Sequence, residues 1–478
     1  MFGNLGACLH SHAAGIEPIT PEYFIGKFDE HRAAAGLITR LEAFWDEIND
    51  YTPRQAKKKY RPHTFQQDKL PARSYREKKF VLPYFADHAA AFSGAMRGIG
   101  MKTGILPMPD EETVALGEDA SSGKECHAYS IIAGDLIKFA KSKREGGEIF
   151  YFPGTKNLCL LSQYGESMNY ILQDLGIKDL EVLAPPFDFT TGLLGIDGLT
   201  LLWSGLVSID LLIKAACEKR PYELEKGMTD KIHKMNLADI EEGLATRSLA
   251  PALKRCAKRL RSIPICPEER PLVGIAGDIY TRQHPVANHN LFLKLEELGC
   301  EVMPSPLFVD EVDFNVGKKL SRAINDRDLP GGAGAGLLHL RKEWQRRKIR
   351  KELKGTVRSV HELGYKDVIR FTSRYLHQDN NVILLLNIAK VADFVAKGAS
   401  GVINAICFNC MLGTVSEAIA ARVQSDYNTI PIPTMIYSGT DIQVEKTKLE
   451  AFVFQVKNYN DRHKKDSSLS CRSEVAIS

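Results

Sequence analysis

The chain of 478 residues lacks a strong excess of either charge. Its 63 Lys and Arg residues nearly balance its 59 Asp and Glu residues, which gives a formal net charge of +4 at pH 7. It also lacks a basic stripe with interleaved aromatic side chains, which a single-strand nucleic-acid binder needs. The composition therefore argues against a nucleic-acid partner, and its 44% apolar and 26% charged residues are ordinary for a soluble globular protein.

The sequence has little that predicts export or a membrane anchor. The N-terminal segment MFGNLGACLHSHAAG has no charged region followed by an apolar core, so we expect no signal peptide. The most apolar stretch covers residues 192–217, and its uncharged part between Asp197 and Asp210 is too short to span a bilayer. A buried helix is expected there. These features predict a cytoplasmic protein without a membrane partner.

Cysteine is also too sparse for a disulfide scaffold, with ten residues in the whole chain. In the reducing compartment expected here, free thiols are usually buried small hydrophobic residues. The segment FNCMLGTVSEAIAARV, residues 408–423, differs because Cys410 lies at a strand-to-helix junction, three residues after Cys407. A disulfide, a metal or cluster ligand, a redox nucleophile or a core cysteine would each account for these thiols.

Apolar strand-like runs alternate with helical segments along two stretches of the chain. In residues 79–265, four such runs are followed by a helical connector of about 70 residues. In residues 266–460, the pattern starts again and contains a basic helical insertion at about 312–365, which we expect to form an exposed long helix or lid. The alternation predicts an α/β protein with two tandem domains, each a doubly wound parallel sheet.

The two ends of the chain do not follow this pattern. Residues 1–78 are predicted to form a helical and linker-like N-terminal extension. Residues 54–79 contain ten Lys or Arg residues and only two Asp or Glu residues. This charge run favours a solvated linker over an anion-binding arm. Residues 461–478 are polar and predict a disordered tail.

Three cysteines occupy turns where doubly wound sheets place their sites, outside the carboxyl ends of the strands. Cys126 precedes a helix, Cys159 follows the strand EIFYFP through a short turn, and Cys410 follows the strand GVINAICF. A helix N-terminus lowers the pKa of a thiol, because its free N–H groups and dipole stabilise the anion. Thiolates bind metals and iron–sulfur clusters. On placement alone, buried structural cysteines remain the alternative.

Five ordered blocks between Lys79 and Tyr459 carry a family resemblance. They are GKECHAYSIIAGDLIKFAK, FPGTKNLCLLSQYGESMNYILQDLG, PLVGIAGDIYTRQHPVANHNLFLKLEELGCEV, FNCMLGTVSEAI and IPIPTMIYSGTDIQVEKTKLEAFVFQ. On these blocks the chain resembles the iron–sulfur component of 2-hydroxyacyl-CoA dehydratases and benzoyl-CoA reductases. It is most similar to the branch of acyl-CoA dehydratase activase-related proteins, to which the double-cubane cluster proteins are kin.

The resemblance implies an iron–sulfur cluster, of 4Fe–4S or double-cubane type, between two flavodoxin-like domains. By motif its cysteine ligands correspond to Cys126, Cys159 and Cys410, and Cys407 is an extra thiol that could substitute for one of them. The resemblance further implies a homo- or heterodimer that passes single electrons to an acyl-CoA thioester or a small molecule. A separate ATP-hydrolysing activase would supply the electrons, since the chain has no P-loop motif G-x-x-x-x-G-K-S/T.

The residues that frame these cysteines depart from the family pattern. Asn157-Leu158 stand where the family has Gly-Pro, and Leu160 stands where it has an Arg, a fixed positive donor. Two alternatives to an enzyme component therefore stay open. One is a non-catalytic subunit that bears a cluster for electron transfer or assembly. The other, less favoured, is a dithiol oxidoreductase that uses the Cys-x-x-Cys pair Cys407 and Cys410.

The turn after the strand PLVGIAGDIY offers three further candidates for binding a cofactor or ligand: Tyr280, Arg282 and Asn288. Arg282 could contact a phosphate or carboxylate, although an Arg that stabilises the turn accounts for it at least as well. The cluster hypothesis also makes a geometric prediction, which is that the sulfur atoms of Cys126, Cys159 and Cys410 converge.

Overall fold

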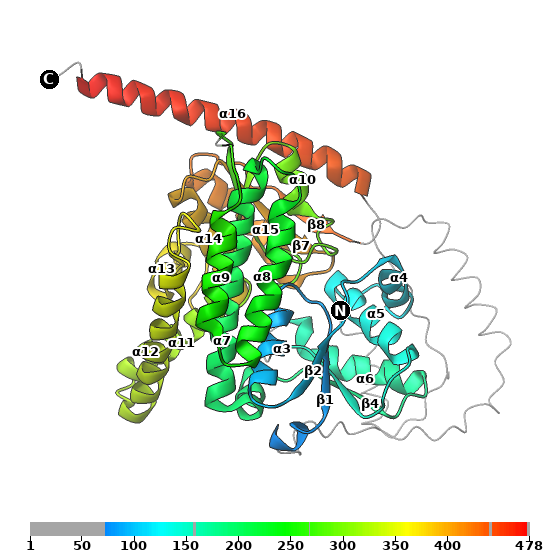
Figure 1. The fold of residues 1–478 in the computed structure, drawn as a ribbon. Helices are drawn as coiled ribbons and strands as arrows, with labels where there is room; N and C mark the ends of the chain where they lie inside the picture. The colour runs from blue at the N-terminus through cyan, green and yellow to red at the C-terminus, as the bar shows by residue number, and fades with distance from the viewer. Residues whose placement is uncertain (1–71, 156–158, 267, 439–441, 476–478) are drawn as a thin grey trace. The chain divides into compact units, whose positions relative to one another are not determined.

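The structure is a computed structural model that describes residues 72–155, 159–266, 268–438 and 442–475. The predicted N-terminal extension therefore lies outside the described residues up to residue 71. Apart from residues 121–125, the described residues belong to one compact unit. Two parallel sheets and the helices around them form this unit (Figure 1).

The first sheet has four parallel strands in the order β2-β1-β3-β4. Its central strands β1 and β3 are largely buried, as expected for a sheet covered by helices on two sides, and Phe80, Phe150 and Tyr151 are fully buried. The strands are β1 (Lys79–Leu82), β2 (Lys102–Ile105), β3 (Glu148–Tyr151) and β4 (Leu180–Leu183), and the helices are α3 (Ala89–Gly98), α4 (Glu111–Asp119), α5 (His127–Lys141) and α6 (Tyr164–Asp174).

The helical connector contains α7 (Phe187–Lys219), α8 (Met228–Ala245) and α9 (Leu249–Arg261). A kink interrupts α7 at Gly195, whose φ of 64° is in the left-handed region that favours glycine. The segment Phe189–Tyr222 is long and apolar enough to cross a membrane, but 67% of its most apolar window is buried inside the protein. The buried helix predicted for residues 192–217 is therefore confirmed.

The second sheet repeats the strand order of the first, as β6-β5-β7-β8. β5 and β7 are paired in parallel from Val273 opposite Gly401 to Gly277 opposite Ala405. The strands are β5 (Leu272–Gly277), β6 (Glu301–Pro304), β7 (Gly401–Cys407) and β8 (Thr434–Tyr437), and the helices are α10 (Leu291–Glu297), α14 (Val382–Ala396), α15 (Met411–Asp426) and α16 (Ile442–Val475).

Both sheets change direction of winding at their central pair of strands. The chain moves from β1 outward to β2 and then returns to place β3 on the other side of β1, and β5, β6 and β7 do the same. This is the flavodoxin-like doubly wound order, and ligands of such sheets bind at the carboxyl ends of the strands beside this switch point. The fold class predicted from the sequence is confirmed.

The basic insertion is anchored along one face and is not a free lid. It contains α11 (Val309–Asn325), α12 (Leu329–Glu352) and α13 (Tyr365–Thr372). Trp203 of α7 donates its indole N–H to the carbonyl of Lys342 at 3.2 Å, and the Lys342 ammonium lies 4.6 Å from the centre of the Trp203 ring. Leu337 and Leu340 on α12 are exposed. The insertion therefore contains the long, partly exposed helix that was predicted, and one side of it packs against α7.

The tail also differs from the prediction. Residues 461–475 were expected to be disordered, but α16 continues through them to Val475. No Gly or Pro occurs between Ile442 and Val475, so nothing in the sequence interrupts the helix once the apolar residues at its start have docked. Leu449, Phe452 and Val456 of that first part are buried.

Candidate functional site

Four cysteines lie in turns at the carboxyl ends of the strands. Cys126 is the residue before α5, and Cys159 comes before a short 3-10 helix, Leu160–Gln163. Cys407 is the last residue of β7, and Cys410 precedes α15. Asn409, between the last two, has a φ of 60°, a left-handed conformation that Asn tolerates better than most residues. The local turns therefore place two cysteines from each α/β half at strand or helix ends.

The structure brings these four thiols into one group. The Cys407 thiol is hydrogen-bonded to the thiols of both Cys126 and Cys410. Cys159 lies close enough for the charges of Cys126 and Cys410 to act on it, although burial is the main reason its pKa rises to about 12. The N–H of His127, next to Cys126, donates to the carbonyl of Phe408 at 3.2 Å, which fixes the two halves together at this point.

Cys126 and Cys407 differ in how readily they lose a proton. The hydrogen bond from Cys407 lowers the pKa of Cys126 against the opposing effect of burial, and the hydroxyl of Tyr164 also bonds to the Cys126 sulfur. The pKa of Cys407 is raised well above its usual value by its hydrogen bonds to Cys126 and Cys410 and by burial. Cys126 therefore has the stronger thiolate character, and Cys407 holds the proton between them.

Asp278, the residue after β5, positions Cys407. Its Oδ2 accepts the Cys407 N–H at 2.7 Å, while its Oδ1 accepts the N–H groups of Tyr280 and Thr281 at 2.9 and 2.8 Å. Gly277 allows this close approach, because its φ is 136° and an added Cβ would lie 1.8 Å from the Ala405 carbonyl oxygen. The ends of β5 and β7 are thus locked together beneath the thiols.

A second layer of buried polar groups lies beside the cysteines. The Tyr280 ring stacks on His284 with 4.5 Å between ring centres, and Nε2 of His284 contacts the Tyr84 carbonyl at 2.8 Å. The Tyr280 hydroxyl and Oδ2 of Asp135 are buried and have no hydrogen-bond partner among the described residues. Burial, followed by the charge of Asp135, raises the pKa of Tyr280 well above its usual value. Tyr280 thus connects Asp135 electrostatically to the thiol group.

Asp135 holds a proton at neutral pH. Burial is the main cause that raises the pKa of its carboxyl group to about 8. Between about pH 4 and pH 8 the folded protein keeps this proton and the unfolded chain does not, so the free energy of unfolding falls as the pH rises.

The Asp135→Asn variant is expected to remove this pH dependence, because an amide cannot ionise. The free energy of unfolding of the wild type should fall relative to the variant by up to about 1.4 kcal/mol per pH unit over that window. Urea unfolding of both proteins between about pH 5 and pH 8 measures it. Asp174→Asn, at an exposed position on α6, is the control. Parallel pH profiles for wild type and Asp135→Asn would contradict the assignment.

The other two residues predicted with Tyr280, Arg282 and Asn288, make hydrogen bonds to the backbone, Arg282 to the loop after β6 and Asn288 within its own segment. The guanidinium of Arg282 is buried and donates to the carbonyl groups of Pro306 and Leu307. The Asn288 side chain donates to the Thr281 carbonyl at 2.8 Å and accepts the N–H of Leu291 at 3.1 Å. These contacts stabilise the segment between β5 and α10. Ligand binding by Arg282 and Asn288 stays a prediction.

Sequence reasoning missed Tyr164 and Asp135 as members of this site. Tyr164 follows Cys159 closely in the chain, but it contacts Cys126, 38 residues away. Asp135 is a single polar residue on the apolar face of α5, and such an isolated carboxylate is the only signal that the sequence gives for it.

The side chains of the site were compared with those that hold a metal ion in proteins. In the part of the chain that the structure describes, no group of three or more His, Cys, Asp or Glu side chains is arranged to hold one metal ion. No protein-family model matches the chain, and no curated protein is significantly similar to it. The doubly wound fold and the group of thiols are therefore the observations from which a function is inferred.

Proposed function

We propose that the chain is the iron–sulfur component of a low-potential reductase or dehydratase. It would act on an acyl-CoA thioester or a small molecule by single-electron transfer, in the cytoplasm, with electrons supplied by a separate ATP-hydrolysing activase. One observation carries the proposal: two turns from each α/β half bring four cysteines together at the carboxyl ends of the strands.

The residues present fit a cluster of several irons. The donors are cysteine thiols, the side chains that hold such clusters, and the helix that follows Cys126 or Cys410 favours the thiolate. Cys126, Cys159 and Cys410 would hold it, with Cys407 as a fourth or substitute ligand. A cluster of this kind supplies single electrons at low potential.

The rest of the site would orient these ligands and keep water away. Tyr164 would donate its hydroxyl hydrogen to the sulfur of Cys126, and Asp278 would hold the backbone of Cys407. Cys126 and Cys407 are 7% and 3% exposed, so little water reaches their sulfur atoms. Asp135 would keep a proton available on its carboxyl group behind Tyr280.

Anaerobic purification from a host that makes iron–sulfur clusters tests the proposal. We expect oxygen-sensitive iron and acid-labile sulfide, roughly four of each per chain for one 4Fe–4S cluster and more for a double cubane. Reduction by an activase and ATP, followed by turnover of an acyl-CoA thioester, would separate an enzyme component from a cluster-bearing electron-transfer or assembly subunit. An iron-free, air-stable protein would refute the cluster.

The hydrogen bonds among the thiols favour one second candidate, a dithiol oxidoreductase. The Cys407 thiol is hydrogen-bonded to the thiols of Cys410 and Cys126. Either pair of thiols could therefore be oxidised to a disulfide while a substrate disulfide is reduced. This function requires an iron-free protein in which two thiols disappear as the substrate disulfide accepts two electrons. Thiol counting before and after reaction distinguishes it from the cluster.

A further inference from the structure

The outer face of α12 carries a row of exposed apolar side chains. Leu337 is 70% exposed, Leu340 is 68% exposed and Trp344 is 55% exposed. Ala333, which is also exposed, begins the row, and the four residues recur at intervals of four, three and four. This spacing places them along one side of the helix, as in the contact face of a helix pair. Large apolar side chains gathered on an exposed face are typical of an interaction site.

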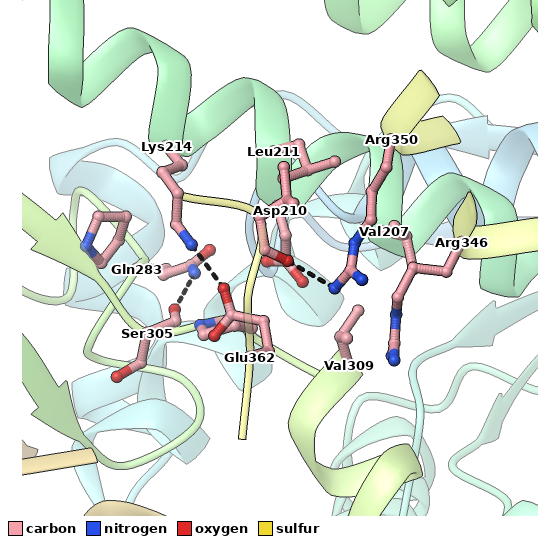
Figure 2. A pocket seen from close by; sticks show the side chains of 13 residues that line it. Val207, Asp210, Leu211, Lys214, Gln283, Ser305, Val309, Arg346, Arg350 and Glu362 are labelled. Carbon is pink, nitrogen blue, oxygen red and sulfur yellow. Dashed lines mark hydrogen bonds and ion pairs between the residues drawn. The ribbon is translucent and has the colours of Figure 1, made fainter. Parts of the chain in front are cut away.

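The opposite face of α12 is the one that packs against the rest of the fold. Lys342 and Ile349 are buried there. Arg346 and Arg350 line a small pocket together with Val207 of α7 (Figure 2). Because α12 is held along this inner face, the outer row can meet a partner without any rearrangement of the helix.

Glycines beside the outer row indicate a close neighbour. Four glycines lie between Gly331 and Gly336, although glycine weakens a helix interior relative to alanine. At Gly334 and Gly336 an added Cβ would meet no atom within 4 Å, so packing inside the chain does not require glycine at either position. Glycine allows another backbone to approach closely. These positions therefore fit a second helix that lies against the outer row.

The charges along α12 are divided between its two ends. Residues 326–340 contain two Asp and one Arg, whereas residues 341–352 contain seven Lys or Arg and two Glu. Arg347, Lys348 and Lys351 of the second group are exposed. Two copies of α12 that run in the same direction would place these cations against each other. Two copies in opposite directions would place each cationic end at the acidic start of the other, which is the complementary arrangement.

We propose that α12 pairs with α12 of a second copy of this chain, antiparallel and across a twofold axis. Leu337 lies against the partner's Leu340 in this pair. Trp344 lies against the partner's Ala333, where the small side chain leaves room for the indole ring. Since the axis is twofold, each of these contacts occurs twice. The outer row of each copy is thus covered by the outer row of the other.

The same register brings the oppositely charged ends together. Lys351 lies 14 residues after Leu337, and Asp326 lies 14 residues before Leu340. When Leu337 is paired with the partner's Leu340, Lys351 therefore comes beside the partner's Asp326. The interface contains none of the cysteines, so the proposal does not rest on the iron–sulfur function.

Sedimentation velocity of the full chain over a range of concentrations tests the interface. We expect the wild type to show a concentration-dependent equilibrium between monomer and dimer. Leu340→Asp should raise the Kd of the dimer at least about tenfold, because it places a carboxylate at the centre of the apolar contact. Leu337→Asp should do the same. Leu224→Asp is the control, since Leu224 is 67% exposed and lies outside α12.

Two further measurements accompany each variant. Thermal melting checks that the substitution leaves the fold intact. Iron content, measured on the same samples, keeps the interface and the cluster apart: a dimer without iron supports the interface alone, and an iron-bearing monomer refutes the interface alone.

Exchange of charges tests the antiparallel direction. Lys351→Glu and Asp326→Lys are each expected to raise the Kd of the dimer about threefold or more, because each places like charges together at both ends of the pair. The double variant restores opposite charges and should return the Kd to within about twofold of the wild type. Lys254→Glu, at an exposed position on α9, should leave the Kd unchanged.

Three outcomes would overturn the proposal. The first is a wild type that stays monomeric at about 50 µM, which would leave the outer row to a different protein. The second is a dimer that Leu340→Asp and Leu337→Asp weaken no more than Leu224→Asp, which would place the interface elsewhere. The third is a double charge variant with a higher Kd than either single variant, which would exclude the antiparallel pair.

Discussion

The Cys410→Ser variant is expected to lose most of the iron and acid-labile sulfide found in the anaerobically purified wild type. Serine removes the thiolate but keeps a side-chain oxygen at the start of α15, where the Cys410 sulfur accepts the Gly413 N–H at 3.4 Å. Because Ser is a favoured residue at a helix N-cap, the helix should stay intact. Loss of iron in a protein that melts normally would therefore report on ligation and not on folding.

Matched variants make the result specific to the group of four thiols. Cys126→Ser and Cys159→Ser should lose iron in the same way, whereas Cys266→Ser at an exposed position should keep it. Cys407→Ser decides between the two roles open to that residue: retained iron makes Cys407 an accessory thiol, and lost iron makes it a ligand. Wild-type iron content in Cys410→Ser, Cys126→Ser and Cys159→Ser alike would contradict the assignment of ligands.

The fold could be predicted because its signals are local. Buried parallel strands are short apolar runs bounded by turns, and the runs beginning at Lys79 and Leu272 are of this kind. Helix boundaries were harder. In the segment VANHNLFLKLEELG, apolar residues occur along the whole length, but α10 begins only at Leu291. His289 and Asn290 before it have φ values of 50° and 60°, and a regular helix cannot include them.

The candidate site was only partly visible in the sequence, for a physical reason. The rule that sites lie at the carboxyl ends of strands, applied to turns that precede helices, identifies Cys126, Cys159 and Cys410 from local pattern alone. It cannot identify Tyr164 or Asp135, because their importance depends on which side chains tertiary packing places against them. Arg282 shows the converse: its place in a turn beside the site suggested a ligand, but its hydrogen bonds are made to two backbone carbonyls.

The Lys390→Met variant is expected to lose about 3–5 kcal/mol of the free energy of unfolding, the cost of leaving buried charges without a partner. Lys390 lies on α14 and is 2% exposed. Its ammonium is 2.9 Å from Asp310, 2.6 Å from Glu362 and 3.3 Å from Asp393. Burial alone would lower the pKa of Lys390, but these three carboxylates outweigh it and raise the pKa above its usual value. Methionine keeps an unbranched apolar side chain of similar length and removes the charged ammonium group.

Urea denaturation of a matched set separates lost charge from lost packing. Lys397→Met removes a more exposed partner of Asp393 and should cost at most about 1 kcal/mol. Adding Asp310→Asn to Lys390→Met should recover part of the loss, because one of the uncompensated carboxylates is then neutral. If Lys390→Met lost no more free energy of unfolding than Lys397→Met, the buried charges around Lys390 would not stabilise the fold as proposed.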